Sequence, residues 1–260
     1  MHNRILKYIL PALAACFIFT NAKAEDDSQQ TKQSQNDMKT GLIIRGGYAI
    51  GGTSPIPLPK EIRSIEAFTP MGGLALGIDG YRYYNKNWGL TAGIHLFSEG
   101  MYTEAQVKNY HMQISMGGET LEGNFTGINK NTNTMIGITV PLTATYRTGD
   151  RWTFRFGPYF SYHLRKKFDG SVYDGYLREG GPTGQKVIIS KDNPATYDFS
   201  DNLRNAYWGL EANVDYRIYN RINVFALIDW SLTDAFKKNF TTITFPMYPI
   251  YATVGLAYYY

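Results

Sequence analysis

The C-terminal segment of the chain, residues 247–260, alternates between two kinds of side chain at successive positions. Successive side chains of a β-strand point to opposite faces, so a period of two predicts a strand whose faces meet different surroundings. One face carries small or polar side chains such as Thr253 and Gly255. The other face is apolar and consists of Ile250, Ala252, Val254, Leu256, Tyr258 and Tyr260. This segment therefore favours a sheet protein with one continuous apolar surface.

Seven earlier segments repeat this alternation. Together with the C-terminal segment they give eight strands, an even number, as a closed antiparallel transmembrane barrel of bacteria requires. We therefore predict an all-β fold, an eight-stranded antiparallel up-and-down transmembrane β-barrel, over residues 41–260. The seven earlier strands are predicted at residues 41–50, 71–84, 88–98, 135–147 and 151–165, from Trp208 to Ile218 and from Ile222 to Trp230.

The connections between the predicted strands alternate in length. Tight hairpin turns are expected around residues 85–87, 148–150 and 219–221. Outer-membrane barrels have short periplasmic turns and longer extracellular loops. The asymmetry therefore predicts a barrel in the cell outer membrane whose long loops lie outside the cell. These long connections are residues 51–70, 99–134, 166–203 and 237–246.

The N-terminus has the features of a secretory signal peptide. Arg4 and Lys7 precede an apolar stretch that ends at the cleavage motif Ala22-Lys23-Ala24. We therefore predict a signal peptide over residues 1–24. Residues 25–40 are polar and show no apolar periodicity, which predicts a flexible periplasmic leader.

A lipoprotein signal is the alternative for this segment. Leu13-Ala14-Ala15-Cys16 matches a lipobox, which would make Cys16 a lipidated first residue. The apolar run continues past Cys16, and this continuation favours ordinary cleavage after Ala24. Because Cys16 is the only cysteine, the mature chain would then have no disulfide.

The charge of the chain argues against a nucleic-acid partner. The precursor has a formal net charge of +4. Arg4, Lys7 and Lys23 leave with the predicted signal peptide, so the mature chain is close to neutral. A protein that binds nucleic acid or an anionic membrane surface through charge needs a strongly basic patch instead.

Alternation alone leaves open which face points outward, because a soluble lipocalin-like barrel would enclose its apolar face. Aromatic residues make up 15% of the chain, and at both ends of the predicted strands they flank an aliphatic middle. Aromatic belts at the two membrane–water interfaces have this arrangement, so we predict that the apolar face meets lipid. The predicted girdles comprise Trp88, Tyr146, Trp152, Tyr216, Tyr258 and Tyr260 at the short turns, and Tyr162, Trp208 and Trp230 at the long loops.

The opposite face of the predicted strands then lines the lumen and is rich in charge. An eight-stranded barrel is only wide enough inside for side chains to fill it, and buried charges are tolerated when they are paired. We therefore predict a plug of arginine–carboxylate pairs, with a conducting lumen as the alternative. The predicted plug residues are Arg45, Asp79, His95, Arg147, Arg155, His163, Arg165, Glu211, Asp215, Arg217 and Asp229.

Three short motifs lie in the fourth and fifth predicted strands and their hairpin. They are Ile138-Thr139-Val140-Pro141-Leu142, the turn at Gly149-Asp150, and Phe156-Gly157-Pro158-Tyr159-Phe160-Ser161-Tyr162. These motifs resemble the PorT-like outer-membrane β-barrel family, common in Bacteroidetes-type bacteria. The resemblance extends over residues 41–260 and implies an eight-stranded, often Tyr-rich barrel without an assigned activity. It supplies no catalytic residues.

The alternative to a barrel without enzymatic activity is an enzyme that acts on outer-leaflet lipid. Eight-stranded lipid A deacylases and acyltransferases need a histidine, a serine and an acidic residue near the outer rim, and a triad requires hydrogen-bond contact between its members. His95 lies near Ser98 and Glu99, but Ser98 falls on the opposite face of the strand. Ser161 and His163 share a face without a defined acidic partner. We therefore predict no catalytic residues.

We expect a non-enzymatic integral outer-membrane barrel with a plugged polar lumen. Its role would be structural, or it would bind a ligand or protein through its long extracellular loops. A narrow passive porin-like channel is the second hypothesis and a lipid-modifying enzyme the third. The expected partners are outer-membrane lipid, the barrel-insertion machinery, which would recognise strand 247–260, and an unidentified extracellular ligand or protein. We expect no cofactor and no metal.

Overall fold

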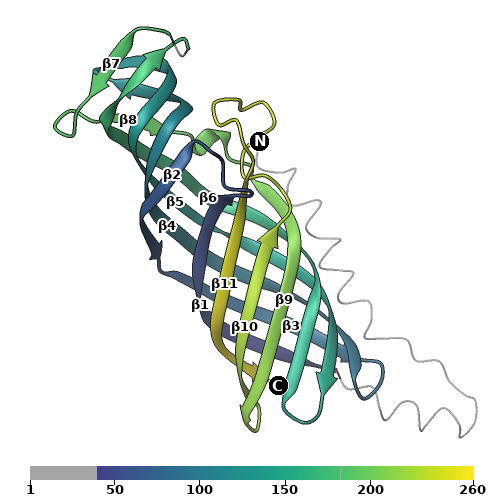
Figure 1. The fold of residues 1–260 in the computed structure, drawn as a ribbon. Coiled ribbons are helices and arrows are strands. Elements are labelled where there is room, and N and C mark those ends of the chain that lie inside the picture. The colour runs from purple at the N-terminus through teal and green to yellow at the C-terminus, as the bar shows by residue number, and fades with distance from the viewer. Residues whose placement is uncertain (1–39, 182) are drawn as a thin grey trace, which may run out of the picture. The chain divides into compact units, whose positions relative to one another are not determined.

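The computed structural model describes residues 40–181 and 183–260, which form eleven β-strands in one sheet. Eight strands are joined by antiparallel ladders in the order β1-β3-β4-β5-β6-β9-β10-β11, and β11 pairs with β1 to close a ring (Figure 1). The predicted signal peptide, residues 1–24, and the predicted leader up to residue 39 lie outside the described residues. The ring strands are β1 (Thr40–Pro55), β3 (Gly73–Tyr83), β4 (Trp88–Met116), β5 (Glu119–Thr148), β6 (Trp152–Glu179), β9 (Ala206–Tyr219), β10 (Ile222–Ser231) and β11 (Met247–Tyr259).

The ring confirms the predicted eight-stranded antiparallel barrel. Each predicted strand overlaps one ring strand. Strands that follow each other around the ring also follow each other in the chain, apart from the short β2 (Ile62–Met71) between β1 and β3 and two short strands between β6 and β9. Three tight turns join β3 to β4, β5 to β6 and β9 to β10 at one end of the ring. We call this the short-turn end and the opposite end the long-loop end.

The apolar face of the ring strands points outward, as predicted. Large apolar side chains that alternate along each strand are exposed, such as Ile44, Leu76 and Phe156. Their neighbours in sequence point inward and are mostly small or polar. A lipocalin-like barrel with an apolar interior is therefore wrong for the ring, because its apolar face would be buried. An exposed apolar band around a polar interior is the surface of a transmembrane barrel.

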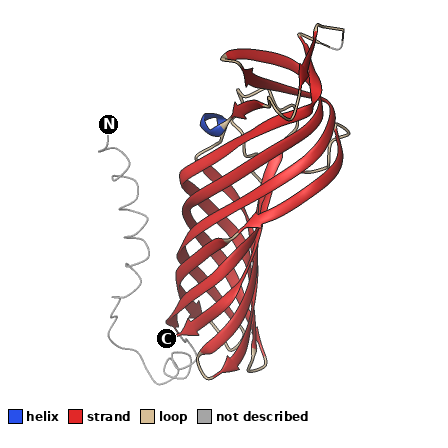
Figure 2. Ribbon diagram, turned by 90° about the vertical axis from the view of Figure 1, so that its left-hand side faces the viewer, coloured by secondary structure: helices blue, strands red, loops and turns tan. Residues whose placement is uncertain are grey.

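The long-loop end differs from the sequence prediction, because residues 99–134 and 166–203 are not loops. The β4–β5 ladder continues to Met116 opposite Glu119, and the β5–β6 ladder continues to Gly123 opposite Glu179. The two predicted loops are therefore largely continuations of strands, whose backbone groups are paired in the ladder. We call this part the distal extension: β4 from Gly100, β5 up to Thr134 and β6 from Arg165. Figure 2 shows it curving away from the ring.

Three short strands complete the distal extension. β2 pairs with β4 beyond the end of β3, while β7 (Lys186–Ile189) and β8 (Ala195–Asp198) pair with β6. A bridge between Ser115 of β4 and Thr196 of β8 makes the extension curl back on itself. The short 3-10 turn η2 (Ser200–Asn202) follows. Among the described residues, no helix has the length and apolar character needed to cross a membrane.

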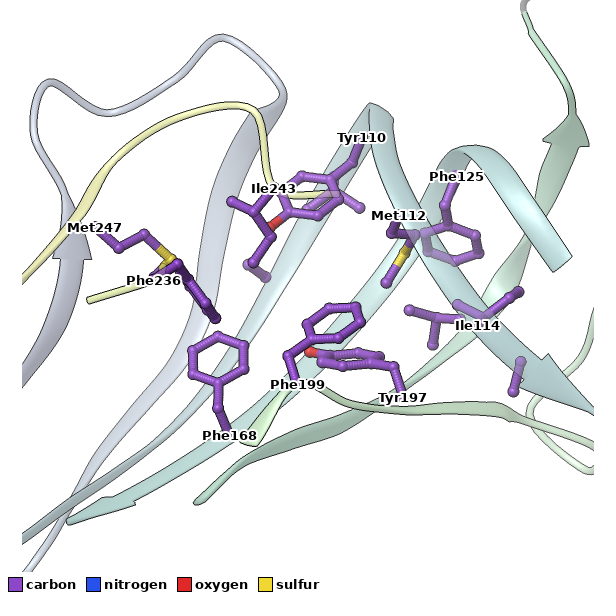
Figure 3. Close-up of a cluster of buried hydrophobic side chains, with 14 of the residues drawn as sticks. Tyr110, Met112, Ile114, Phe125, Phe168, Tyr197, Phe199, Phe236, Ile243 and Met247 are labelled. Atoms are coloured by element: carbon purple, nitrogen blue, oxygen red, sulfur yellow. The ribbon is translucent and has the colours of Figure 1, made fainter. Parts of the chain in front are cut away.

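The inner face of the distal extension buries its own hydrophobic core. Its aromatic rings pack closely, with Tyr197 stacked on Phe199 at 5.0 Å and Phe168 edge-on to Phe236 at 5.1 Å between ring centroids. This core is separate from the polar interior of the ring. Figure 3 labels ten of its members, which are Tyr110, Met112, Ile114, Phe125, Phe168, Tyr197, Phe199, Phe236, Ile243 and Met247.

The prediction that Arg165 lies in the lumen is wrong. The β5–β6 register shifts between the pair Ile136 and Arg165 and the pair Gly137 and His163, so β6 carries one extra residue, Leu164. A one-residue bulge reverses the faces of all residues beyond it. His163 therefore points inward, whereas Leu164 and Arg165 are both exposed.

Candidate functional site

The remaining predicted plug residues lie on the inner face of the ring strands. Their side chains come from seven different strands, so the ring brings together residues that are far apart in sequence. Arg45, Asp79, His95, Arg155, His163, Glu211 and Asp215 are buried, and Arg147, Arg217 and Asp229 are half-buried.

Asp79 is the centre of one ionic group. Its Oδ2 lies 2.7 Å from Nη2 of Arg45, and its Oδ1 lies 2.7 Å from Nε2 of His95. Gly77 stands opposite both Arg45 and His95 in the ladders, and a Cβ there would come within 2.5 Å of the His95 ring. The glycine thus leaves the space through which an arginine and a histidine reach the same carboxylate.

Arg155 is the centre of a second ionic group. Its Nη1 lies 2.5 Å from Oδ2 of Asp215, and its Nη2 donates a hydrogen bond to the hydroxyl of Tyr259. Asn213 also donates to Asp215 Oδ2, at 3.3 Å. These contacts join β6, β9 and the C-terminal strand β11 across the interior. Removal of Arg155 or of Asp215 would therefore leave the other residue as an unpaired buried charge.

Glu211 and Asp229 depart from the predicted pattern of arginine–carboxylate pairs. They stand directly opposite each other on β9 and β10, and neither forms an ion pair with any residue that the structure describes. Glu211 Oε2 and Asp229 Oδ1 are buried and have no hydrogen-bond partner within residues 40–181 and 183–260. A cavity of about 30 Å³ beside Asp229, Arg45 and His95 has room for a water molecule.

The two histidine–serine combinations in the sequence do not assemble into a triad. The Ser161 hydroxyl is hydrogen-bonded to Thr139 at 2.5 Å, and His163 packs instead against the rings of Phe97 and Tyr207. His163 Nδ1 has no hydrogen-bond partner within the described part of the chain. His95 is held by Asp79 and not by a serine. Within the described part of the chain, neither His95 nor His163 is therefore hydrogen-bonded to a serine nucleophile.

The predicted girdle residues lie on the outer face at the two ends of the ring. At the short-turn end Trp88 packs on Tyr146 and Trp152 packs on Tyr216, each pair with ring centroids 4.7 Å apart. Tyr216 is half-buried in its pair. The exposed members are Trp88, Tyr146, Trp152, Tyr258 and Tyr260 at the short-turn end and Tyr162, Trp208 and Trp230 at the other.

A cavity of about 330 Å³ lies within the distal extension. Its walls come from the end of β1, from β2, from the inner faces of β4, β5 and β6, from β8 and from the start of β11 with the segment before it. Val107 and Met112 form its deep wall and are 1% exposed, whereas Ile65 and Phe68 form its rim and are more than half exposed. The volume lies within the range of natural small-molecule sites, about 300–1,000 Å³.

The walls of this cavity are apolar with a few fixed polar groups. None of the described residues that line it is charged. Asn133 donates a hydrogen bond of 2.6 Å to Thr53 at the end of the cavity nearer the lumen, and Tyr197 donates one of 2.8 Å to Asn129. One polar group of the walls is not paired. Asn131 is 9% exposed, and its Oδ1 has no hydrogen-bond partner in the described residues. A buried acceptor without a donor costs about 1–3 kcal/mol.

The outer face of the distal extension is polar. Glu104 accepts hydrogen bonds from the hydroxyls of Tyr173 at 2.7 Å and Tyr102 at 2.9 Å, with the ammonium group of Lys130 at 3.7 Å. These donors, Tyr173 first, hold the pKa of Glu104 below its usual value. On β4, β5 and β6 the extension therefore presents polar groups outward and apolar groups inward, which is the reverse of the ring. β2 differs, because it exposes Ile65 and Phe68.

This cavity was not expected from the sequence, because residues 99–134 were predicted as a loop. The sequence does contain a pattern typical of a strand here, because apolar residues alternate with polar ones at Tyr110, Met112, Ile114 and Met116. The register shift after Val107 hides the continuity with the preceding alternation.

Among the described residues, no group of three or more histidine, cysteine, aspartate and glutamate side chains is arranged to hold a metal ion.

Comparison with known proteins identifies the family of this chain. The model of a family described as "Outer membrane protein beta-barrel domain" matches residues 28–237. No curated protein matches the sequence significantly. The narrower resemblance to PorT-like barrels stays a prediction.

Solved outer-membrane barrels cover most of the chain at low similarity. Ail, the attachment invasion locus protein of Yersinia pestis, solved with the heparin analogue sucrose octasulfate, is 9% identical, covers 85% of this chain and 99% of its own, and has a TM-score of 0.36. OprG from Pseudomonas aeruginosa is 13% identical, covers 86% and 96%, and has a TM-score of 0.30. The outer membrane protease OmpT from Escherichia coli is 15% identical, covers 86% and 95%, and has a TM-score of 0.29.

Proposed function

We propose, from the premise that this chain belongs to the outer membrane protein beta-barrel domain family, that it is a non-enzymatic binding protein of the cell outer membrane. Its ring is the membrane-spanning part, and the distal extension lies outside the cell. The ligand is a small amphipathic molecule with a long apolar part. It binds in the cavity of the distal extension, and the ring anchors that cavity at the cell surface.

The observation that carries this proposal is the apolar cavity itself. A cavity of about 330 Å³ with uncharged walls exposes apolar surface that a ligand would cover, and each buried methylene contributes about 0.8 kcal/mol to binding. The unpaired Oδ1 of Asn131 supports a ligand that also carries a hydrogen-bond donor, such as a hydroxyl or an amide. An apolar chain with one donor satisfies both features.

The lumen supports anchoring more than conduction. Arg45, Asp79 and His95 meet in one ionic group, and Arg155 and Asp215 in another, both across the interior. The cavity beside the first group is about 30 Å³, which suits a water molecule and no solute. A plugged ring beneath an open cavity is the arrangement expected of a receptor-like surface protein.

Binding can be tested with dansyl-labelled undecanoic acid and the full chain held in amphipol. Ala105 faces the cavity, and its sequence neighbour Gln106 faces solvent on the same strand. The phenyl ring of Ala105→Phe would displace at least two methylenes of the ligand from the cavity. The affinity for the dansyl probe should therefore fall about tenfold or more. Gln106→Phe adds the same ring outside the cavity and should leave affinity unchanged. Absence of saturable binding to the parent chain would refute the proposed function.

A further inference from the structure

We propose that the cavity of the distal extension opens sideways toward the outer leaflet, and that its occupant is the acyl chain of a lipid that resides in the membrane. The inference rests on the proposed function, since it names the ligand class and its route. The acyl chain would slide out of the leaflet between β1 and β2 while the charged head group stays outside the cavity, and a hydroxyl or amide on the acyl part would donate to Oδ1 of Asn131.

The first support is a seam between two strand edges that share no ladder. The β1–β3 ladder ends at Ala49 opposite Gly73. Within the part of the chain that the structure describes, residues 50–55 of β1 are therefore paired on their β11 side alone. β2 is likewise paired on one side, with β4. Both edges line the cavity. In the described structure, no backbone ladder therefore joins β1 to β2 across this part of the cavity wall.

Side chains fill this seam. A Cβ on Gly52 of β1 would stand 3.5 Å from Cε2 of Phe68 on β2 and would overlap the sulfur of Met101. Phe68 is 52% exposed, whereas Met101 is buried behind it. A phenyl ring and a thioether can change rotamer, but a hydrogen-bonded ladder cannot part without losing its bonds. The seam is the part of the wall that opens at the lowest cost.

The rim of the seam continues into the lipid-facing surface. Phe68, Met71, Leu74 and Leu76 follow one another along β2 and β3, and all are exposed. No charged residue lies between Phe68 and Leu76. An acyl chain that moves along this row keeps apolar contact from the leaflet to the cavity, whereas a chain entering from water would first have to leave its membrane or micelle.

The depth of the seam fits the membrane interface. Gly52 pairs with Ile250, which pairs in turn with Trp230 of the predicted girdle at the long-loop end. Unpaired strand edges are not tolerated against lipid in the hydrocarbon core, except where they line a cavity. Below Ala49 the β1–β3 ladder is closed and satisfies this requirement. The seam begins where that ladder ends.

The test uses the full chain in nanodiscs that contain a phosphatidylethanolamine with a diazirine on one acyl chain. After photolysis, mass spectrometry locates the labelled residues. Lateral entry predicts labels on Met101 and Val107, which are buried in the cavity, in addition to labels on the lipid-facing Leu74 and Leu76. Labels confined to the lipid-facing residues would overturn the inference.

Variants of the seam make the result specific. Gly52→Phe fills the seam, so labelling of Val107 should fall at least fivefold while labelling of Leu76 stays constant. Phe68→Ala widens the seam and should raise labelling of Val107, which keeps the inference testable should Gly52→Phe not fold. Leu76→Phe adds bulk on the lipid face and serves as the matched control. Unchanged labelling of Val107 in both seam variants would show that the chain enters elsewhere.

The outcomes separate the inference from the proposed function. Dansyl-undecanoic acid that binds the amphipol-held chain, together with lipid labels confined to Leu74 and Leu76, refutes lateral capture of lipid and leaves the binding function standing. The ligand would then be a free amphiphile taken from water. Failure of both the dansyl probe and the diazirine lipid to reach the cavity refutes both proposals.

Discussion

Replacing Asp79 by asparagine should destabilise the barrel strongly. The side chain is the sole ion-pair partner of Arg45 and His95 among the described residues, and it lies 2.7 Å from each. Asparagine has the same shape, so Asp79→Asn removes charge with little change in packing. The guanidinium of Arg45 would remain inside the lumen without its ion-pair partner.

The expected size of the effect follows from burial. Breaking a buried ion pair by removing one partner costs about 3–5 kcal/mol. For a domain of about 150–250 residues, each kcal/mol shifts the unfolding midpoint by about 2–4 °C. Asp79→Asn should therefore lower Tm by roughly 6–20 °C in a fixed detergent at a fixed scan rate, as followed by the loss of β-sheet circular dichroism.

Two controls separate this reasoning from a general sensitivity to mutation. Lys167 and Asp169 form an ion pair at 2.8 Å with 57% and 32% of their side chains exposed, and such pairs contribute about 0–1 kcal/mol. Lys167→Ala should thus shift Tm by no more than about 4 °C. Combining Asp79→Asn with Arg45→Met removes both charges and should restore most of the loss. If Asp79→Asn is as mild as Lys167→Ala, then Arg45 is not confined by the plug, and the idea of a closed lumen fails.

Three further predictions address topology, electrostatics and assembly. An epitope inserted at Gly117, in the β4–β5 turn, should be labelled on intact cells, whereas one at Asn87 should require permeabilisation; surface labelling at Asn87 alone would invert the proposed orientation. Tyr173→Phe removes a hydrogen bond to the Glu104 carboxylate, so the pKa of Glu104, measured by carbon NMR, should rise toward its usual value, and a constant value would contradict the assigned cause. Deleting Tyr260, which is exposed beyond β11, should leave refolding in detergent intact but reduce insertion in cells, and normal insertion would show that the terminal aromatic is not recognised.

The ring could be predicted from the sequence because its signal is local. Each strand needs one apolar face against lipid, and this requirement imposes a period of two that is readable within ten residues. The inward charges followed from the same alternation. Arg165 was misassigned because a bulge at Leu164 reverses the faces, and no local composition marks that bulge. The pairing of Asp79 with Arg45 and His95 depends on the register of three strands, which alternation does not specify.

The cavity could not be predicted, because its walls come from distant parts of the chain. Thr53, Phe68, Val107 and Ile243 meet only after the ring closes and the distal extension curls back. The sequence marks residues 110–116 as a possible strand, but a strand alone does not indicate a space. Whether apolar side chains meet to form a core or leave a cavity depends on their volumes at the contact, and a linear pattern does not contain that information.

The reversal of polarity along β4, β5 and β6 relates the plug to the cavity. In the ring the outward side chains are apolar, as Leu96 and Ile136 are, whereas in the distal extension they include Glu104 and Lys130. Polar groups turn toward water and apolar groups turn away from it. The inner face must then change from charged to apolar at the same height where the outside changes from lipid to water. The ionic groups around Asp79 and Arg155 thus lie beneath the apolar interior of the extension, so the proposed ligand would bind away from the ion pairs that stabilise the ring.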